Sequence, residues 1–197
     1  MKTEFEVVFP DINKKEVIQK IEELWWVQIK KNILMKRIVF ENSNNRKWSF
    51  LRVRDEWDKI TCTYKEENVW KLDINSVKEL ETVVEDFDVM VNIFKKLWLN
   101  QKSYQETYRE VWGINNEIEI MIDLWPWLKP YIEIEWENEE IVKKYSKLLW
   151  FDYNNWIFWT VSQVYKKELW LDYDYVNNLK EIIFDNPPKK KKLVLCE

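Results

Sequence analysis

Alternating apolar and polar residues predict β-strands along most of the chain. Runs with a period of two indicate strands at residues 3–9, 27–30, 34–41, 48–55, 58–66, 77–85, 102–112, 116–124 and 129–136. Apolar residues at helical spacing predict helices at 11–24, 86–97, 138–149 and 160–169, with a last short helix beyond 172. This combination predicts an α+β protein, and a single domain over residues 1–185 is the default for 197 residues. Residues 186–197 include two prolines and a run of lysines, which predict a solvated tail.

Nearly every predicted strand has one charged face and one apolar face, because side chains two residues apart on a strand point the same way. In the first strand, Glu4 and Glu6 lie on one face, while Phe5 and Val7 lie on the other. The other predicted strands show the same separation of polar and apolar side chains. The other polar sets are Arg52 with Arg54, Thr61 with Thr63 and Lys65, Glu79 with Glu81, and Glu133 with Glu135.

This pattern fits two architectures. An open antiparallel sheet would leave its charged face in water and pack its apolar face on helices, which is what patterning alone favours. A closed barrel would instead turn the charged face inward and cover the apolar outer face with helices. Because unpaired buried charge is costly, such an interior must meet water, a metal or a polyanion. Glu-x-Glu pairs suit hard cations such as Mg²⁺ or Mn²⁺, and neighbouring arginines and lysines suit phosphate oxygens.

Composition and charge exclude several function classes. With 31 basic and 35 acidic residues, the chain gives no electrostatic reason to expect nucleic acid. It has no apolar run of about 18 residues that would indicate a membrane span, and no signal-peptide core at its start, so we expect a cytoplasmic protein. The absence of histidine removes His-based catalysis and most zinc sites. Cys62 and Cys196 have no motif spacing and indicate neither a disulfide nor a metal site.

The chain holds 14 tryptophans but a single glycine, Gly113. Average usage of about 7% predicts roughly 14 glycines at this length. Three predicted helices end in Leu-Trp followed by an apolar residue, at Trp98, Trp150 and Trp170. The position after a helix usually needs a left-handed backbone, which glycine provides and a residue with a Cβ atom resists. Trp57 lies between two predicted strands, where a hairpin turn favours Gly or Asn.

We therefore hypothesise that most of these tryptophans are glycines in the living organism. Some bacteria with AT-rich genomes read the codon UGA as glycine, and a translation table that assigns UGA to tryptophan would create this pattern. The absence of alanine and histidine, with abundant lysine, asparagine and isoleucine, fits an AT-rich gene. Trp112 and Trp125 are the two that we expect to be genuine. The alternative is a tryptophan-rich protein whose indoles distort its turns.

Several segments together resemble the CYTH, or triphosphate tunnel metalloenzyme, family, which includes class IV adenylate cyclases, thiamine triphosphatases and inorganic triphosphatases. The resemblance covers about residues 3–170 and rests on EFEVVF, FLRVRDE, KITCTYK, KELE, YREVW, EIEIMIDLWPWLKPYIEIEW and LLWFDYNNWIFWTVSQVY. It implies a closed eight-stranded antiparallel β-barrel, with a charged lumen that holds a triphosphate and helices packed on the outside. Members commonly have glycine at positions that are tryptophan in this chain, namely Trp57, Trp127, Trp136, Trp150 and Trp159.

The resemblance also implies roles for individual residues. Glu4 and Glu6 match the family's N-terminal acidic motif. Glu133 and Glu135 match its C-terminal acidic pair, and Asp123 lies nearby as a further ligand or a supporting group. Together these acids would hold Mg²⁺ or Mn²⁺. The implied phosphate-binding cations are Arg37, Arg52, Arg54, Lys65 and Arg109, and the implied supporting acids are Glu79 and Glu81, which would orient the cations or a second metal.

Two positions depart from the family's pattern. The N-terminal motif usually continues as Glu-x-Glu-x-Lys, but its last position here is Val8. A cation is also common shortly before the position of Arg109, where this chain has Thr107 and Tyr108. Each lost charged hydrogen bond would weaken the grip on a triphosphate by about 1.5–3 kcal/mol, so these positions bear on substrate choice and on activity itself. Lys36 or Lys102 would be the candidates to compensate.

The expected function is divalent-metal-dependent hydrolysis of a triphosphate, either inorganic triphosphate, ATP or thiamine triphosphate. Hydrolysis is favoured over cyclisation because the sequence shows no feature that would recognise adenine. Two alternatives stay open. One is a class IV adenylate cyclase that converts ATP to cyclic AMP and pyrophosphate. The other is a non-catalytic module that binds polyphosphate or nucleotide, which the departures at Val8 and Thr107 favour. Neither nucleic acid nor a membrane is an expected partner, and the sequence does not give the oligomeric state.

Overall fold

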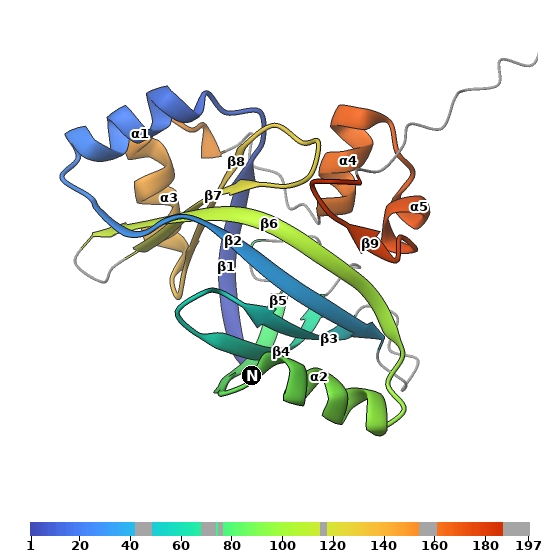
Figure 1. Ribbon diagram of the computed structural model, residues 1–197. Coiled ribbons are helices and arrows are strands. Elements are labelled where there is room, and N and C mark those ends of the chain that lie inside the picture. The colour runs from blue at the N-terminus through green and yellow to red at the C-terminus, as the bar shows by residue number, and fades with distance from the viewer. Residues whose placement is uncertain (42–48, 68–73, 75–76, 115–117, 154–160, 187–197) are drawn as a thin grey trace, which may run out of the picture.

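The computed structural model describes residues 1–41, 49–67, 74, 77–114, 118–153 and 161–186, apart from the side chain of Glu4. The strands are β1 (Lys2–Phe9), β2 (Val27–Glu41), β3 (Ser49–Asp55), β4 (Ile60–Glu67), β5 (Val77–Val84), β6 (Gln101–Ile114), β7 (Ile118–Leu124), β8 (Tyr131–Trp136) and β9 (Glu181–Ile182). The helices are α1 (Lys14–Glu23), α2 (Phe87–Lys96), α3 (Glu139–Leu148), α4 (Val161–Leu169) and α5 (Tyr173–Asn177). This is the predicted α+β fold (Figure 1). The predicted tail lies outside the described residues from position 187 onward.

The sheet closes on itself through β2, which pairs with β3 along one edge and with β6 along the other. The ring runs β2-β3-β4-β5-β1-β8-β7-β6 and back to β2, which gives eight barrel strands. Every pairing within this ring is antiparallel. The expected eight-stranded antiparallel barrel is therefore confirmed. The two-residue β9, which the sequence pattern did not predict, pairs in parallel with Tyr104 and Gln105 and brings the sheet to nine strands within the described residues.

One difference from the predicted elements concerns β2. The alternation predicts separate strands at 27–30 and 34–41, but the structure has one continuous strand from Val27 to Glu41. Its pairing with β6 shifts register between Gln28 and Lys30, and again between Lys30 and Ile33. Bulges of this kind insert extra residues into a strand without ending it. The polar residues at 30–32 therefore interrupt the sequence pattern but not the strand.

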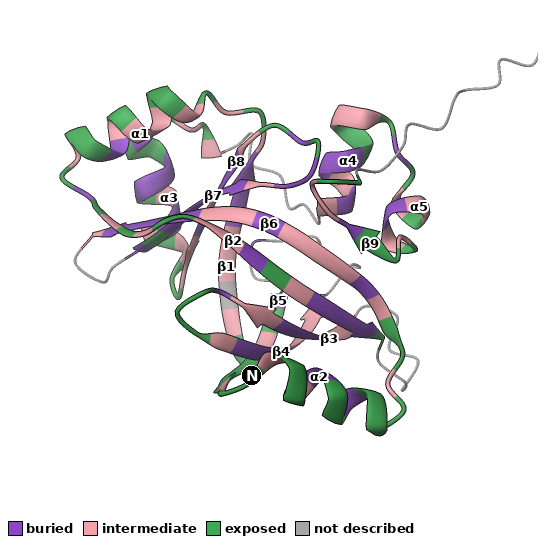
Figure 2. Cartoon of the chain, in the orientation of Figure 1, coloured by how far each residue is buried: buried purple, intermediate pink, exposed green. Residues whose placement is uncertain are grey.

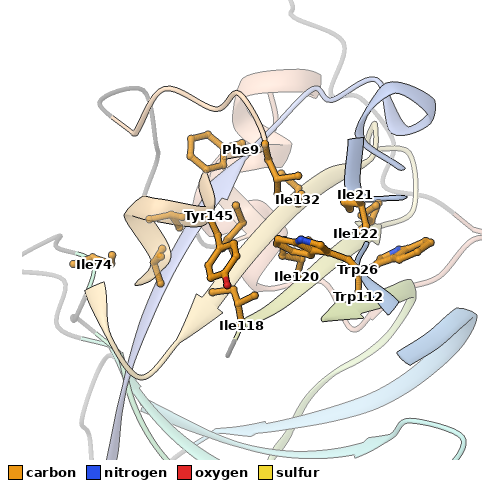
Figure 3. Close-up of a cluster of buried hydrophobic side chains, with 14 residues drawn as sticks. Phe9, Ile21, Trp26, Ile74, Trp112, Ile118, Ile120, Ile122, Ile132 and Tyr145 are labelled. Atoms are coloured by element: carbon orange, nitrogen blue, oxygen red, sulfur yellow. The ribbon is translucent and has the colours of Figure 1, made fainter. Parts of the chain in front are cut away.

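Three buried clusters attach the helices to the barrel, and two of them lie on its outer, apolar face. The largest lies between α1, α3 and strands β1, β7 and β8, and includes the fully buried Ile120, Ile132 and Ile134 (Figure 3). Helix α2 covers β2, β3 and β4, where Phe94 packs edge-on against Phe40. The third cluster joins α4 and α5 to the barrel. The helices bury the side that faces the sheet and expose the other (Figure 2). None of the described helices is long and apolar enough to cross a membrane.

Three of the helices end in the same backbone arrangement. After α1, the N–H of Trp25 donates to the carbonyl of Glu22 and the N–H of Trp26 to that of Ile21. The same pair of hydrogen bonds follows α2 at Trp98 and α3 at Trp150. It is the arrangement of a Schellman motif, in which the residue after the cap takes a left-handed conformation and is usually glycine. Here that residue is tryptophan each time.

The described tryptophans divide into two conformational groups. Trp26, Trp112 and Trp125 are buried and, like Trp136 in β8, have no positive φ angle. The members of the other group all have φ between 58° and 74° and are 61–90% exposed. This second group consists of Trp25, Trp57, Trp98, Trp127, Trp150 and Trp170.

Positive φ is strained for a residue with a Cβ atom, and it costs roughly 1 kcal/mol or more at each position. Trp127 illustrates the local reason, since Trp125 accepts a hydrogen bond from the N–H of Leu128 across a turn with Pro126 in its second position. A turn with proline second and positive φ third is of type II, and its third position normally holds glycine. Gly113, in contrast, has no positive φ. The backbone thus places glycine conformations at tryptophan positions.

Candidate functional site: a charged cavity inside the barrel

The charged faces of the strands meet inside the barrel, where they line a cavity of about 870 Å³. Because residues two apart share a face, closing the sheet joins the Glu-x-Glu and Arg-x-Arg patterns into one lining. The structure therefore has the closed architecture rather than the open sheet. Glu4 apart, whose side chain is not described, all the predicted site residues line this cavity. They are Glu6, Arg37, Arg52, Arg54, Lys65, Glu79, Glu81, Arg109, Asp123, Glu133 and Glu135.

Three carboxylates form one group on the β1 and β8 side of the cavity, which we call the acidic group: Glu6, Glu133 and Glu135. Glu6 lies directly opposite Glu135 in the antiparallel register. One carboxylate oxygen from each residue lies within 4.8 Å of the other two. Burial, together with Glu6 and Asp123, raises the pKa of Glu133 to about 7 against the opposing influence of Arg109. Burial and Glu133 also raise the pKa of Glu135. Like charges are thus held together at an energetic cost.

The donor set of the acidic group fits a hard divalent cation. Carboxylate oxygens are the ligands that Mg²⁺ and Mn²⁺ prefer, and a bound cation would offset the repulsion that raises these pKa values. Lys65 supplies part of that compensation, since its Nζ lies 3.7 Å from Glu6 Oε2. Which metal binds stays a prediction, as do the ligand roles of the individual carboxylates.

Arg109 connects the acidic group to the rest of the cavity. Its Nε and one Nη donate hydrogen bonds of 2.6 Å to the two oxygens of Asp123, and the same Nη lies 3.0 Å from Glu133. Asp123 is 2% exposed and directly opposite Arg109 in the β6–β7 register. Although burial works against the charge, the two carboxylates hold the pKa of Arg109 well above its usual value. Asp123 therefore has both oxygens engaged by a guanidinium, and in the described residues it lies outside the acidic group.

Three further arginines form the arginine group: Arg37, Arg52 and Arg54. Arg37 lies directly opposite Arg54 across β2 and β3, and Arg52 follows two residues away on the same face. Arg37 donates a 2.7 Å hydrogen bond to the neutral Gln105 and lies 4.4 Å from the ring centre of Trp125. Burial and then the neighbouring guanidiniums lower its pKa to about 9. Arg37 is therefore a half-buried cation with little anionic compensation.

Arg52 is only partly compensated. It donates a hydrogen bond to the hydroxyl of Thr63, and its Nη lies 3.6 Å from Glu81. Its Nε is buried without a partner among the described residues. Burial and Arg54 lower its pKa, which Glu79 and Glu81 raise only in part, so that it stands at about 10. The arginine group as a whole therefore favours an anion inside the cavity.

The predicted supporting acids lie beside the predicted cations. Glu81 accepts a 2.8 Å hydrogen bond from Thr63, next to Arg52. Glu79 lies 4.0 Å from Lys65, which also approaches the acidic group. These contacts are those of residues that orient cations, although the role of each residue stays a prediction.

Both positions that depart from the family pattern are buried. Val8 is 6% exposed and belongs to the buried cluster of Trp125 and Tyr131, which α4 and α5 complete. Thr107 is also buried. Trp125 and Tyr131 also line the cavity, so an apolar wall lies next to the position where the resemblance predicts a lysine. Of the two suggested compensating residues, Lys102 lines the cavity, whereas Lys36 is exposed and does not.

The sequence analysis missed several charged residues of the cavity, of which Glu56 is the most buried at 6% exposure. The signal was present, because Glu56 continues the period of two that begins with Arg52 and Arg54. The pattern predicts a turn at residues 56–57 between the strands at 48–55 and 58–66, and this assignment hides the third member of the series. Lys30, which contacts Glu56, lies in the irregular part of β2 where the alternation breaks down.

A closed antiparallel barrel with facing groups of carboxylates and guanidiniums in its cavity defines the class of triphosphate tunnel folds. The chain belongs to the CYTH domain family, because the sequence profile of that family matches residues 40–154, more than half of its length. No curated protein sequence matches the chain.

Solved structures share this fold at low sequence identity. PH1012 protein from Pyrococcus horikoshii OT3 is 23% identical with a TM-score of 0.64, over 80% of this chain and 96% of its own. A putative adenylate cyclase from Vibrio parahaemolyticus is 8% identical with a TM-score of 0.66, over 83% of this chain and 97% of its own. The putative adenylyl cyclase HpAC1 from Hippeastrum, described as having a dominant triphosphatase activity, is 16% identical with a TM-score of 0.59, over 89% and 100%. These similarities establish the fold.

Proposed function

We propose that the protein is a divalent-metal-dependent phosphohydrolase that cleaves a triphosphate bound inside the barrel. One observation carries the proposal: a single cavity contains an acidic group suited to a divalent cation and an arginine group that lacks sufficient anions. Phosphoryl transfer needs both, because the enzyme's main task is to position the phosphates and to neutralise their charge. The triphosphatase activity described for the Hippeastrum protein of the same fold supports hydrolysis over cyclisation.

The arginine group would bind the phosphate chain. Guanidiniums donate paired hydrogen bonds to phosphate oxygens, and they do so most strongly where water is excluded. Arg52 is buried and Arg37 half-buried in the folded barrel before any substrate arrives, so little reorganisation is needed on binding. Arg109, already held by Asp123, would contribute its charge at the border of the acidic group.

The acidic group would hold Mg²⁺ or Mn²⁺, which when bound supplies positive charge to phosphate oxygens and makes a coordinated water more acidic. The protein's own residues prepare this site. Arg109 keeps the Glu133 carboxylate oriented through its 3.0 Å hydrogen bond. Lys65 lies between Glu6 and Glu79 and moderates the repulsion in that part of the lining.

Two alternatives use the same cavity. A class IV adenylate cyclase would orient ATP so that the ribose hydroxyl attacks the α-phosphorus and pyrophosphate leaves, and a putative adenylate cyclase shares the fold. A non-catalytic module would bind polyphosphate or nucleotide without turnover. The apolar wall around Val8 favours this module, because it replaces a cation that the family pattern places there.

Incubation of the purified protein separates the three functions. The protein is mixed with tripolyphosphate, ATP or thiamine triphosphate and with Mg²⁺ or Mn²⁺. We expect release of phosphate, lost in Arg52→Gln and in the absence of metal. Cyclic AMP with pyrophosphate would identify a cyclase. Binding without any product would identify the module and reject hydrolysis.

We further propose that the six tryptophans with positive φ are glycines in the organism, encoded by reassigned UGA codons. Their backbone conformations, turn hydrogen bonds and exposure support this, and they agree with the excess of tryptophan over glycine. Trp112 and Trp125 differ from them in being buried and in having no positive φ. The gene supplies the test. TGA codons are expected at Trp25, Trp57, Trp98, Trp127, Trp150 and Trp170, with TGG at Trp112 and Trp125, and TGG at the six positions would reject reassignment.

A further inference from the structure

Glu56 is a nearly buried carboxylate that the proposed metal and phosphate groups do not include. It lies in the turn between β3 and β4, is 6% exposed, and lines the same cavity. Its backbone N–H donates a 2.9 Å hydrogen bond to the carbonyl of Lys59, which fixes the turn. An acid buried at such a place is costly unless cations surround it.

Cations from three segments surround Glu56. Arg54 approaches one carboxylate oxygen with its Nε at 2.8 Å and an Nη at 2.5 Å. Lys30 lies 3.1 Å from the other oxygen and Lys59 3.8 Å from it, while the hydroxyl of Thr61 is a further donor. Although burial acts in the opposite direction, Arg54, Lys59 and Lys30 lower the pKa of Glu56 to about 2. Glu56 is therefore ionised at any physiological pH.

Arg54 differs in this respect from its two neighbours in the arginine group. Arg37 has the neutral Gln105 as its hydrogen-bond partner, and Arg52 lies 3.6 Å from Glu81. Within the part of the chain that the structure describes, Arg54 is the member of this group that donates a hydrogen bond to a carboxylate, that of Glu56. The guanidinium of Arg54 is thus held in place by Glu56, a residue that does not belong to the arginine group.

We infer that Glu56 is a positioning residue, which holds Arg54 in the orientation that receives a phosphoryl oxygen. This inference rests on the proposed function, because it requires a triphosphate in the cavity. A positioning role and a role in charge balance alone predict opposite effects of removing the Glu56 charge on anion binding. Removing the Glu56 charge makes the cavity more attractive to an anion, whereas releasing Arg54 weakens a charged hydrogen bond to that anion. A positioning role means that the second effect is the larger.

The test is metal-free binding of tripolyphosphate, measured by calorimetry so that turnover does not interfere. We expect Glu56→Gln to weaken binding about tenfold even though it adds net positive charge to the cavity. Asp58→Asn is the matched control. Asp58 lies 2.7 Å from the same Lys30, but it is exposed and has no contact with Arg54 within the described residues. This control should bind as tightly as the wild type or more tightly. Circular dichroism and thermal unfolding verify that both variants are folded.

Unchanged or tighter binding by Glu56→Gln would overturn the positioning role and leave Glu56 as a charge-balancing group. A second measurement uses Arg54→Lys, in which Glu56→Gln should cause no further loss, because Glu56 acts through Arg54. Independent, additive losses would also overturn the inference. Wild-type binding without hydrolysis in the presence of metal rejects the phosphohydrolase and not the role of Glu56, whereas a wild type that does not bind tripolyphosphate rejects both.

Discussion

Arg37 and Arg54 lie directly opposite each other on adjacent strands, with both guanidiniums on the inner face of the barrel. Two cations in this register repel each other, and only Arg54 has a close carboxylate partner among the described residues. A fold keeps such an arrangement at a cost to its stability. An anion bound in the cavity, as we propose, would offset that cost and so link the stability of the barrel to its ligand.

Arg37→Met should separate stability from binding. Loss of a half-buried, poorly compensated charge is expected to stabilise the ligand-free protein by about 1 kcal/mol, since methionine can still pack against Trp125. The increase in melting temperature that tripolyphosphate gives to the wild type should disappear. Thermal unfolding with and without tripolyphosphate measures both effects. Lys36→Met, an exposed neighbour on the outer face, is the control and should change neither. A destabilised Arg37→Met variant that still responds to tripolyphosphate would contradict the expectation.

The stability of the metal-free protein should depend on the ionisation of Glu133. Its pKa in the folded state, about 7, lies above the ordinary value of 4.5. A carboxyl group with a raised folded-state pKa stabilises the fold fully below its unfolded pKa and loses this contribution as pH rises through the folded value. The free energy of unfolding should therefore fall between pH 4.5 and about pH 7. Urea unfolding across this window tests it, and Glu133→Gln should show a flatter profile than the wild type.

Metal affinity should have the opposite pH dependence. A cation requires ionised carboxylates, so Mn²⁺ should bind more tightly as pH rises towards and above the pKa of Glu133. We expect Glu135→Gln to lower Mn²⁺ affinity at least about tenfold. Glu81→Gln is the comparison, because Glu81 contacts Thr63 and Arg52 rather than the acidic group. Calorimetric titration with Mn²⁺ measures each affinity, and equal losses in the two variants would show that the acidic group is not the binding site.

Substitution of tryptophan by glycine should have opposite signs in the two conformational groups. At Trp98 or Trp170, glycine relieves positive φ and should stabilise the protein by about 1 kcal/mol. At Trp112, which is 5% exposed, glycine removes a core side chain and should destabilise it by about 3–5 kcal/mol. Urea unfolding of the three single variants measures these differences. Loss of stability at Trp98 and Trp170 would show that the indoles make contacts that outweigh the strain.

The sequence predicted the lining of the cavity well, because strand alternation depends on the local geometry of the chain alone. Glu133 and Glu135 could be assigned to one face without knowing what lay across from them. Closure of the ring could not be derived in this way, since it depends on the pairing of β2 with β6, which are far apart in the chain. The resemblance to a family, and not the pattern, indicated the barrel.

The misses have local causes. Bulges at Lys30 and Ile33 broke the alternation and split one strand into two. Glu56 was not recognised as a cavity residue because it follows the end of β3, where the alternation of the strand continues into a turn. The two residues of β9 are too few to show any period. The engagement of Asp123 by Arg109 was also beyond the sequence, because pairing of two specific side chains is decided by the register of β6 and β7.

If the six exposed tryptophans are encoded by UGA, as proposed above, the choice of expression host changes the surface of this protein. A host that inserts tryptophan at these positions would make a molecule with large aromatic rings protruding from helix ends and turns all around its surface. Such rings promote self-association and adhesion, whatever the barrel binds. The solubility or oligomer size of such material would therefore depend on which residue the expression host inserts at these positions, as well as on the rest of the protein.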